Sequence, residues 1–127
     1  MDCNTALSLL SLSVQASNLF SLAVAVTEYE FAPPAAFSDL NPRIVKQGLA
    51  MLLDDGLQQL RYDLEYEQAP GLYQQSLSVA CSLSAALVEA ALTSEAGGEE
   101  AYDDFCNLSY TVADAVRQLA EDLQDIV

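Results

Sequence analysis

Apolar residues recur three and four positions apart in four stretches of the chain, which is the spacing of one face of an α-helix. The stretch at 102–126 is the most regular of the four. Residues that end helices separate the stretches: a Pro-Pro pair, a Pro-Gly pair and the pair Gly97 and Gly98. Asn41 and Pro42 are the clearest start signal, an N-cap followed by proline at the first helical position. We therefore expect helices at residues 4–30, 42–67, 72–94 and 99–126.

Four helices of this length with short connections predict an all-α protein, an antiparallel (up-down-up-down) four-helix bundle. The 127 residues fit one helical domain, 1–127. The segments "SLSVQAS" (11–17) and "SLSVACS" (76–82) agree at five of seven positions. This agreement leaves two origins open, a duplicated helical hairpin and chance similarity in a biased composition.

The first segment has two neighbouring apolar stripes at helical spacing. One contains Leu7, Leu10 and Val14, and the other runs from Leu9 to Val26. No charged residue occurs from position 3 to position 27, a feature also found in signal peptides and membrane spans. The segment holds many serines and its N-terminal flank has no Lys or Arg, which argues against both. We therefore expect a helix buried against several neighbours.

Acidic residues outnumber basic ones by nineteen to four, which gives a net charge of −15 and a pI near 4.1. Such a charge repels nucleic acid and anionic lipid, so we expect neither as a direct partner. A protein with a basic surface is the favoured partner, although acidity that serves only solubility or a salt-rich cytoplasm gives the same composition. The three cysteines have no CxxC spacing, which argues against a disulfide framework or a metal site and favours the cytoplasm.

The chain has no histidine, which removes the commonest general base and the His-containing nucleophile pairs and metal sites. It has no phosphate-binding glycine motif, and "EAGGEEAYDD" lacks the ligand order of a calcium loop. We therefore expect no enzyme, no catalytic residue, no cofactor and no metal. Two of the four basic residues, Arg43 and Lys46, lie close together. They either contact an anion or partner, or neutralise nearby acids.

The phrase Glu-Tyr-Glu-x-Ala-Pro occurs twice, at 28–33 and 65–70. Acids at the C-terminal end of a helix oppose its dipole, so helix stability does not account for them. In an up-down-up-down bundle the end of the first helix lies at the same pole as the start of the fourth, and the second copy lies at the opposite pole. We expect the first pole to be the partner-binding surface, formed by Glu28, Tyr29, Glu30, Glu99, Glu100, Asp103 and Asp104.

Two classes of function fit these features. The first is a non-enzymatic inhibitor or antagonist that occupies a basic, nucleic-acid-binding surface of a partner protein. Immunity proteins, DNA mimics and anti-CRISPR proteins have similar size and acidity, which is an analogy of class. The alternative is a structural or chaperone-like helical oligomer, for instance a homodimer, whose apolar first and third helices complete their burial against another copy.

Overall fold

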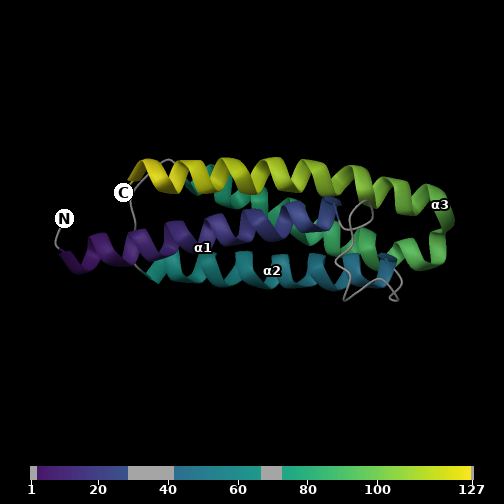
Figure 1. Ribbon diagram of the computed structural model, residues 1–127, viewed down its shortest axis with the longest axis horizontal. Coiled ribbons are helices and arrows are strands. Elements are labelled where there is room, and N and C mark those ends of the chain that lie inside the picture. The colour runs from purple at the N-terminus through teal and green to yellow at the C-terminus, as the bar shows by residue number, and fades with distance from the viewer. Residues whose placement is uncertain (1–2, 29–41, 67–72, 127) are drawn as a thin grey trace.

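The chain is helical throughout residues 3–28, 42–66 and 73–126, which are the residues that the computed structural model describes. Within them, the structure describes the side chains of residues 7–27, 45–66, 73–93 and 99–125. The helices are α1 (Cys3–Glu28), α2 (Pro42–Tyr66) and α3 (Tyr73–Ile126), and these ranges contain no strand (Figure 1). The predicted all-α class is therefore confirmed, and the ends of α1 and α2 agree with the predicted ends within two residues.

Helix α3 folds back on itself, so that the molecule has four helical segments (Figure 1). We call residues 73–93 its first arm and residues 99–126 its second arm. The sequence predicts a break between them at Gly97 and Gly98, but the backbone stays helical through this stretch. Glycine retains its backbone amide, unlike proline, and costs a helix only about 1 kcal/mol relative to alanine. A turn at a glycine pair is therefore possible without loss of the helical hydrogen-bonding pattern.

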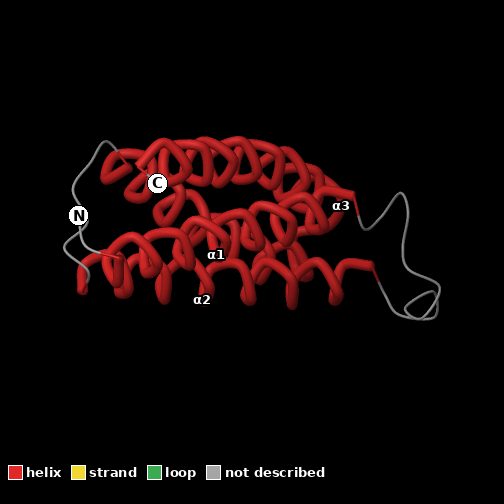
Figure 2. Tube along the Cα trace, turned by 60° about the vertical axis from the view of Figure 1, so that its left-hand side comes forward, coloured by secondary structure: helices red, strands yellow, loops and turns green. Residues whose placement is uncertain are grey.

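The four segments lie side by side along the long axis, and the two chain ends lie at the same end of the molecule (Figures 1 and 2). Ser84 Oγ of the first arm donates to Asp54 Oδ1 of α2 at 3.1 Å. The two arms of α3 are joined by a hydrogen bond from Ser76 Oγ to Asp122 Oδ2. The second arm reaches α1 through Gln124 Nε2, which lies 3.5 Å from Ser17 Oγ.

Close contact between α1 and α2 depends on a glycine. A Cβ atom built on Gly56 would lie 2.4 Å from Leu19 Cδ2, well inside van der Waals contact, so the leucine occupies the space that a side chain would fill. A Cβ atom built on Gly48 would have no such neighbour within 4 Å, so packing does not require a glycine at this position. One of the two glycines of α2 is thus explained by packing.

A single core runs between the segments, and each segment contributes one stripe of buried residues. In every segment the stripe advances by alternating steps of three and four. The four stripes run from Leu9 to Val26, from Lys46 to Leu64, from Tyr73 to Ala91 and from Tyr102 to Leu123. This is the heptad spacing of helices that pack nearly parallel to one another.

The buried face of α2 agrees with the sequence from Leu53 onward and differs before it; the apolar spacing predicts a face of Val45, Leu49, Leu52, Leu53, Leu57, Leu60 and Leu64. The sequence places both Leu52 and Leu53 on the buried face, but Leu52 is exposed and Leu53 is fully buried. Lys46 and Ala50 occupy the buried stripe, while Val45 and Leu49 lie at its edge, half-buried. Two adjacent leucines lie about 100° apart around a helix, so both cannot point at one narrow core.

Helix α1 is also less buried than expected. Its stripe from Leu9 to Val26 enters the core, whereas Leu7, Leu10 and Val14 retain 64 %, 47 % and 53 % of their accessible surface. The expectation that neighbours surround α1 is therefore wrong for this stripe. By length and composition alone, the stretches Leu7–Thr27 and Tyr73–Thr93 could each cross a membrane, but a core helix of a globular protein passes the same test.

Candidate protein-binding surface

The predicted partner-binding residues are only partly described. Glu99, Glu100, Asp103 and Asp104 are exposed at the start of the second arm of α3. Glu28 is the last residue of α1, and its side chain is not described. Tyr29 and Glu30 lie outside the described residues.

We call Glu99, Glu100, Asp103 and Asp104 the acidic turn. The end of α1 and the turn of α3 both point toward the end of the molecule that lies away from the two termini (Figure 1). Helix α2 ends toward the opposite end of the molecule, so its last turn lies far from the end of α1 (Figure 1).

Aromatic residues of the same helical turns anchor the acidic turn to the core. Tyr102 and Phe105 are buried, with ring centroids 6.2 Å apart and planes inclined by 35°. Asp103 and Asp104 stand between them in the sequence and are therefore directed outward. The exposed carboxylates thus project from a helix whose position is determined by its buried aromatic face.

The four carboxylates of the acidic turn make no hydrogen bond or ion pair with any described residue. Acids elsewhere do. Asp63 accepts a hydrogen bond from Gln59 Nε2 at 3.0 Å, and Asp122 accepts one from Gln118 Nε2 at 2.9 Å in addition to that from Ser76. Within the described residues, the hydrogen-bonding capacity of these four carboxylates is therefore unused.

Lys46 lies in the core and not on the surface, with 1 % of its area exposed. Its Nζ donates to Cys106 Sγ at 3.6 Å and lies 5.7 Å from the centroid of the Tyr102 ring. Of the two alternatives left open for Lys46, contact with an anion or partner from the surface is wrong, because the side chain points inward. The ring face and the sulfur stabilise a cation whose burial would otherwise cost several kcal/mol.

The other two basic side chains that the structure describes are each close to an acid of the same helix. Arg61 Nε lies 3.4 Å from Glu65 Oε1, and Arg117 Nη2 lies 3.6 Å from Asp114 Oδ1. Both pairs are exposed, so each adds little to stability. Neither pair involves the acidic turn, and the described cation that lies near it is the buried ammonium of Lys46, beneath the ring of Tyr102.

The charges are segregated by helix. From residue 3 to residue 27, α1 has no charged residue, and Glu89 is the one charge in the first arm of α3. The acids of the described side chains are otherwise on two segments, α2 and the second arm of α3: Asp54, Asp55, Asp63, Glu65, Glu99, Glu100, Asp103, Asp104, Asp114, Glu121, Asp122 and Asp125.

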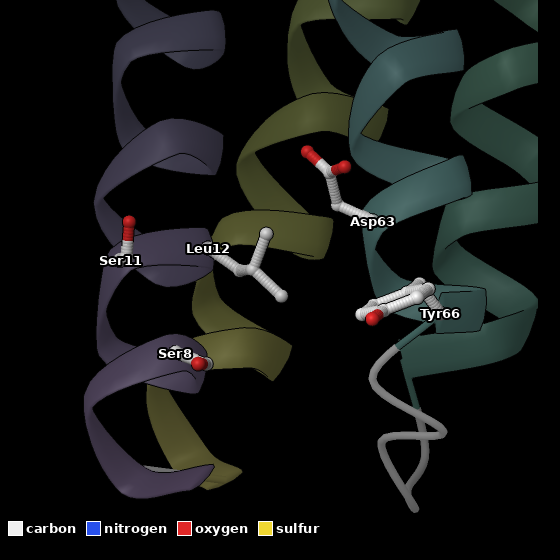
Figure 3. Close-up of a pocket in the computed structure, with 5 residues that line it drawn as sticks. All are labelled: Ser8, Ser11, Leu12, Asp63 and Tyr66. Carbon is white, nitrogen blue, oxygen red and sulfur yellow. The ribbon is translucent and has the colours of Figure 1, made fainter. Parts of the chain in front are cut away.

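A small cavity of about 210 Å³ lies between α1 and α2, close to the end of the molecule that carries the termini. Ser8, Ser11 and Leu12 line it from α1 and face Asp63 and Tyr66 of α2 (Figure 3). Its one carboxylate is that of Asp63, already hydrogen-bonded to Gln59, and no Lys, Arg, His or Cys accompanies the serine and tyrosine hydroxyls among these residues. Two further cavities have volumes of about 190 and 360 Å³.

The described residues contain no group of three or more His, Cys, Asp or Glu that could hold a metal ion. The Cys81 thiol is buried and lies 3.9 Å from the carbonyl oxygen of Leu57. Burial raises its pKa; the charge of Asp54 raises it further, while that of Arg61 lowers it. Burial also raises the pKa of Tyr73, and Glu65 adds to that effect. Neither group has the lowered pKa of an activated nucleophile.

Comparison of the chain with protein-family models, curated proteins and solved structures finds no match.

Proposed function

We propose that this protein is a non-enzymatic, acidic protein-binding module that occupies the basic, nucleic-acid-binding surface of a partner protein. The observation that carries the proposal is the acidic turn: four adjacent carboxylates, all exposed and none engaged by a described residue. Inhibitors of the immunity, DNA-mimic and anti-CRISPR classes act in this manner. The thiols have no disulfide partner among the described residues, which agrees with a cytoplasmic location.

The scaffold in this proposal is an antiparallel, up-down-up-down four-helix bundle, and its origin, a duplicated hairpin or chance similarity of the two halves, stays open. The heptad spacing of all four buried stripes supports a bundle of nearly parallel axes. The alternating directions of the coloured segments in Figure 1 support the topology. A bundle held by its core leaves the exposed faces free to carry charges that the fold does not need.

In this mechanism the carboxylates replace the phosphates that the partner normally binds. Residues 99 and 103 are four positions apart, which is about 6 Å along the helix axis, and residues 100 and 104 repeat the same step. Two rows of negative charge therefore run along one helix. Arg and Lys side chains that bind successive phosphates could pair with these rows, and a net charge of −15 would accelerate the encounter.

The experiment is a pull-down from a lysate of the natural source at low and at moderate salt, with mass spectrometry of the retained proteins. We expect a basic protein that is released as salt rises, because the Debye length falls from about 30 Å at 0.01 M to about 8 Å at 0.15 M. A nucleic acid carrying that protein's binding site should compete with this chain. Retention that is independent of salt, or of nucleic acid, would contradict the proposal.

Two variants of equal charge locate the binding surface. The first neutralises the acidic turn with Glu99→Gln, Glu100→Gln, Asp103→Asn and Asp104→Asn. The control neutralises four acids elsewhere, with Asp55→Asn, Glu89→Gln, Glu121→Gln and Asp125→Asn. Each variant has a net charge of −11, the original −15 plus four. We expect the first to lose at least tenfold in affinity and the control to lose much less; equal losses would mean that net charge, and not this surface, governs binding.

A further inference from the structure

The side of α1 that faces away from the core carries an apolar stripe that the described residues of the chain do not cover. Leu7, Leu10 and Val14 follow one another at steps of three and four, and each is about half exposed or more. At about 100° per residue these positions lie roughly opposite the buried stripe around the helix, so the two stripes are not neighbouring as the sequence analysis expects. We call these three residues the outer stripe.

The outer stripe differs from the other exposed apolar residues in being continuous and without charge. On the first arm of α3, Val79 and Leu92 are exposed but thirteen positions apart, with Glu89 between them. On α2, exposed Met51 and Leu52 are followed, after buried Leu53, by two aspartates. The outer stripe is instead flanked by exposed Ser11 and Ser21, within a helix free of charge from residue 3 to residue 27.

We propose that the outer stripe is the interface of a symmetric homodimer. Two copies, each with a net charge of −15, repel one another wherever their acids meet, and α2 and the second arm of α3 both carry acids. They can approach through the outer stripe with no carboxylate of α1 in the contact, because this helix carries no charge from residue 3 to residue 27; Asp63 of α2 lies beside it, facing Ser8 and Ser11. A basic partner would find no acid of α1 to pair with on this face. A second copy of the same neutral, apolar surface is the occupant that these charges favour.

A two-fold axis near Leu10 makes this interface self-complementary. With the two α1 helices antiparallel, Leu10 packs against Leu10 of the second copy, and Leu7 packs against Val14, as an isologous contact requires. The antiparallel arrangement also places the helix dipoles in opposite directions. The stripe occupies only the N-terminal half of α1, so the contact is small and we expect reversible association.

The dimer has a salt dependence opposite to that of the proposed partner binding. Salt screens the repulsion between two molecules of like charge, so dimerisation should strengthen as salt rises. Binding to a basic partner should weaken over the same range. Dimerisation does not depend on the proposed function, and the two can therefore be tested separately on the same protein.

The test is sedimentation equilibrium of the full chain over a wide range of concentration, at low and at moderate salt, for the original protein, Leu10→Glu and Leu92→Glu. Both substitutions place a carboxylate at an exposed apolar position of a helix, but only Leu10 is in the outer stripe. We expect a monomer–dimer equilibrium that shifts toward dimer with salt, at least a hundredfold weakening in Leu10→Glu, and less than a threefold change in Leu92→Glu. Circular dichroism should show the same helix content in all three, because neither leucine is in the core.

Several results would overturn the proposal. They are a monomer at every concentration and salt, a dimer that tolerates Leu10→Glu, and equal weakening in the two variants. Binding of the monomer to vesicles of neutral phosphatidylcholine, lost in Leu10→Glu, would assign the outer stripe to a lipid surface and would also overturn it.

Discussion

Replacing each of two adjacent leucines of α2 with alanine tests the packing directly. Leu53 is fully buried, whereas Leu52 retains 60 % of its accessible surface. The two positions share the same helix, the same change in helix propensity and the same loss of three carbon atoms. A difference in stability between Leu52→Ala and Leu53→Ala therefore reports burial alone.

Leu53→Ala removes buried apolar surface and leaves a cavity, which in well-packed cores costs about 2 to 5 kcal/mol. Leu52→Ala removes surface that is mostly in water, and substitutions at such sites usually change stability by less than about 0.5 kcal/mol. For a chain of 127 residues, 1 kcal/mol corresponds to roughly 3 to 5 °C in Tm. We thus expect Tm to fall by at least about 6 °C for Leu53→Ala and by no more than about 2 °C for Leu52→Ala.

Circular dichroism during heating measures Tm, and circular dichroism in urea measures the free energy of unfolding. Both variants are compared at the same protein concentration, so that any dimerisation affects their stability equally. An unchanged urea m-value would show that the change lies in stability and not in the unfolded state. If the two variants lost the same stability, or if Leu52→Ala lost more, the register of α2 described above would be wrong.

Two further predictions concern glycines and titration. Gly48→Ala should raise the free energy of unfolding by about 0.5 to 1 kcal/mol, because no atom lies where the new Cβ would stand. Gly56→Ala should not show this increase, because its Cβ would meet Leu19. Urea unfolding of the two variants measures both values, and equal increases would contradict the prediction. The raised pKa values of Cys81 and Tyr73 mean that the folded state disfavours their ionised forms. The protonated Cys81 and Tyr73 side chains therefore contribute fully to the stability of the fold below their usual pKa values, 9.0 for the thiol and 10.0 for the phenol. This contribution is lost as the pH rises through the higher pKa values of the folded state. The free energy of unfolding should therefore fall above pH 9, and Cys81→Ala should make that fall shallower; an unchanged slope would argue against the thiol's role.

The sequence predicts the helices well because their ends carry local signals. Asn41 and Pro42 mark the start of α2, a Pro-Pro pair follows the end of α1, and a Pro-Gly pair follows the end of α2. The turn within α3 is harder to predict, because Gly97 and Gly98 disfavour a helix but do not prevent its backbone hydrogen bonds. Proline removes a donor and glycine does not, so a glycine pair indicates a place to bend more reliably than a place to stop.

Burial is less predictable, because it depends on which neighbour a helix finds. The alternating steps of three and four in α2 extend back from Leu64 to position 46, and this spacing could have located Lys46 in the core. The charge of the Lys46 side chain favours a position on the surface. The aromatic ring that stabilises this charge in the core belongs to Tyr102, which is far from Lys46 in the sequence. In α1 the sequence contains two apolar stripes of the same helical spacing, and it does not show which of them is buried. In the structure the buried stripe is the one that contains Leu19, which packs closely against Gly56 of α2.

The acidic turn and the outer stripe are compatible on one molecule, because they lie toward opposite ends. Leu7 to Val14 belong to the N-terminal half of α1, near the two termini, while the turn of α3 is at the far end (Figure 1). An antiparallel pairing of the N-terminal halves of α1 would direct the two acidic turns away from each other. Such a dimer could bind two partner molecules at once but could not place both turns on one compact partner. Its affinity for a single partner should then equal that of the monomeric Leu10→Glu variant, whereas a dimer with both turns on one face would gain from avidity.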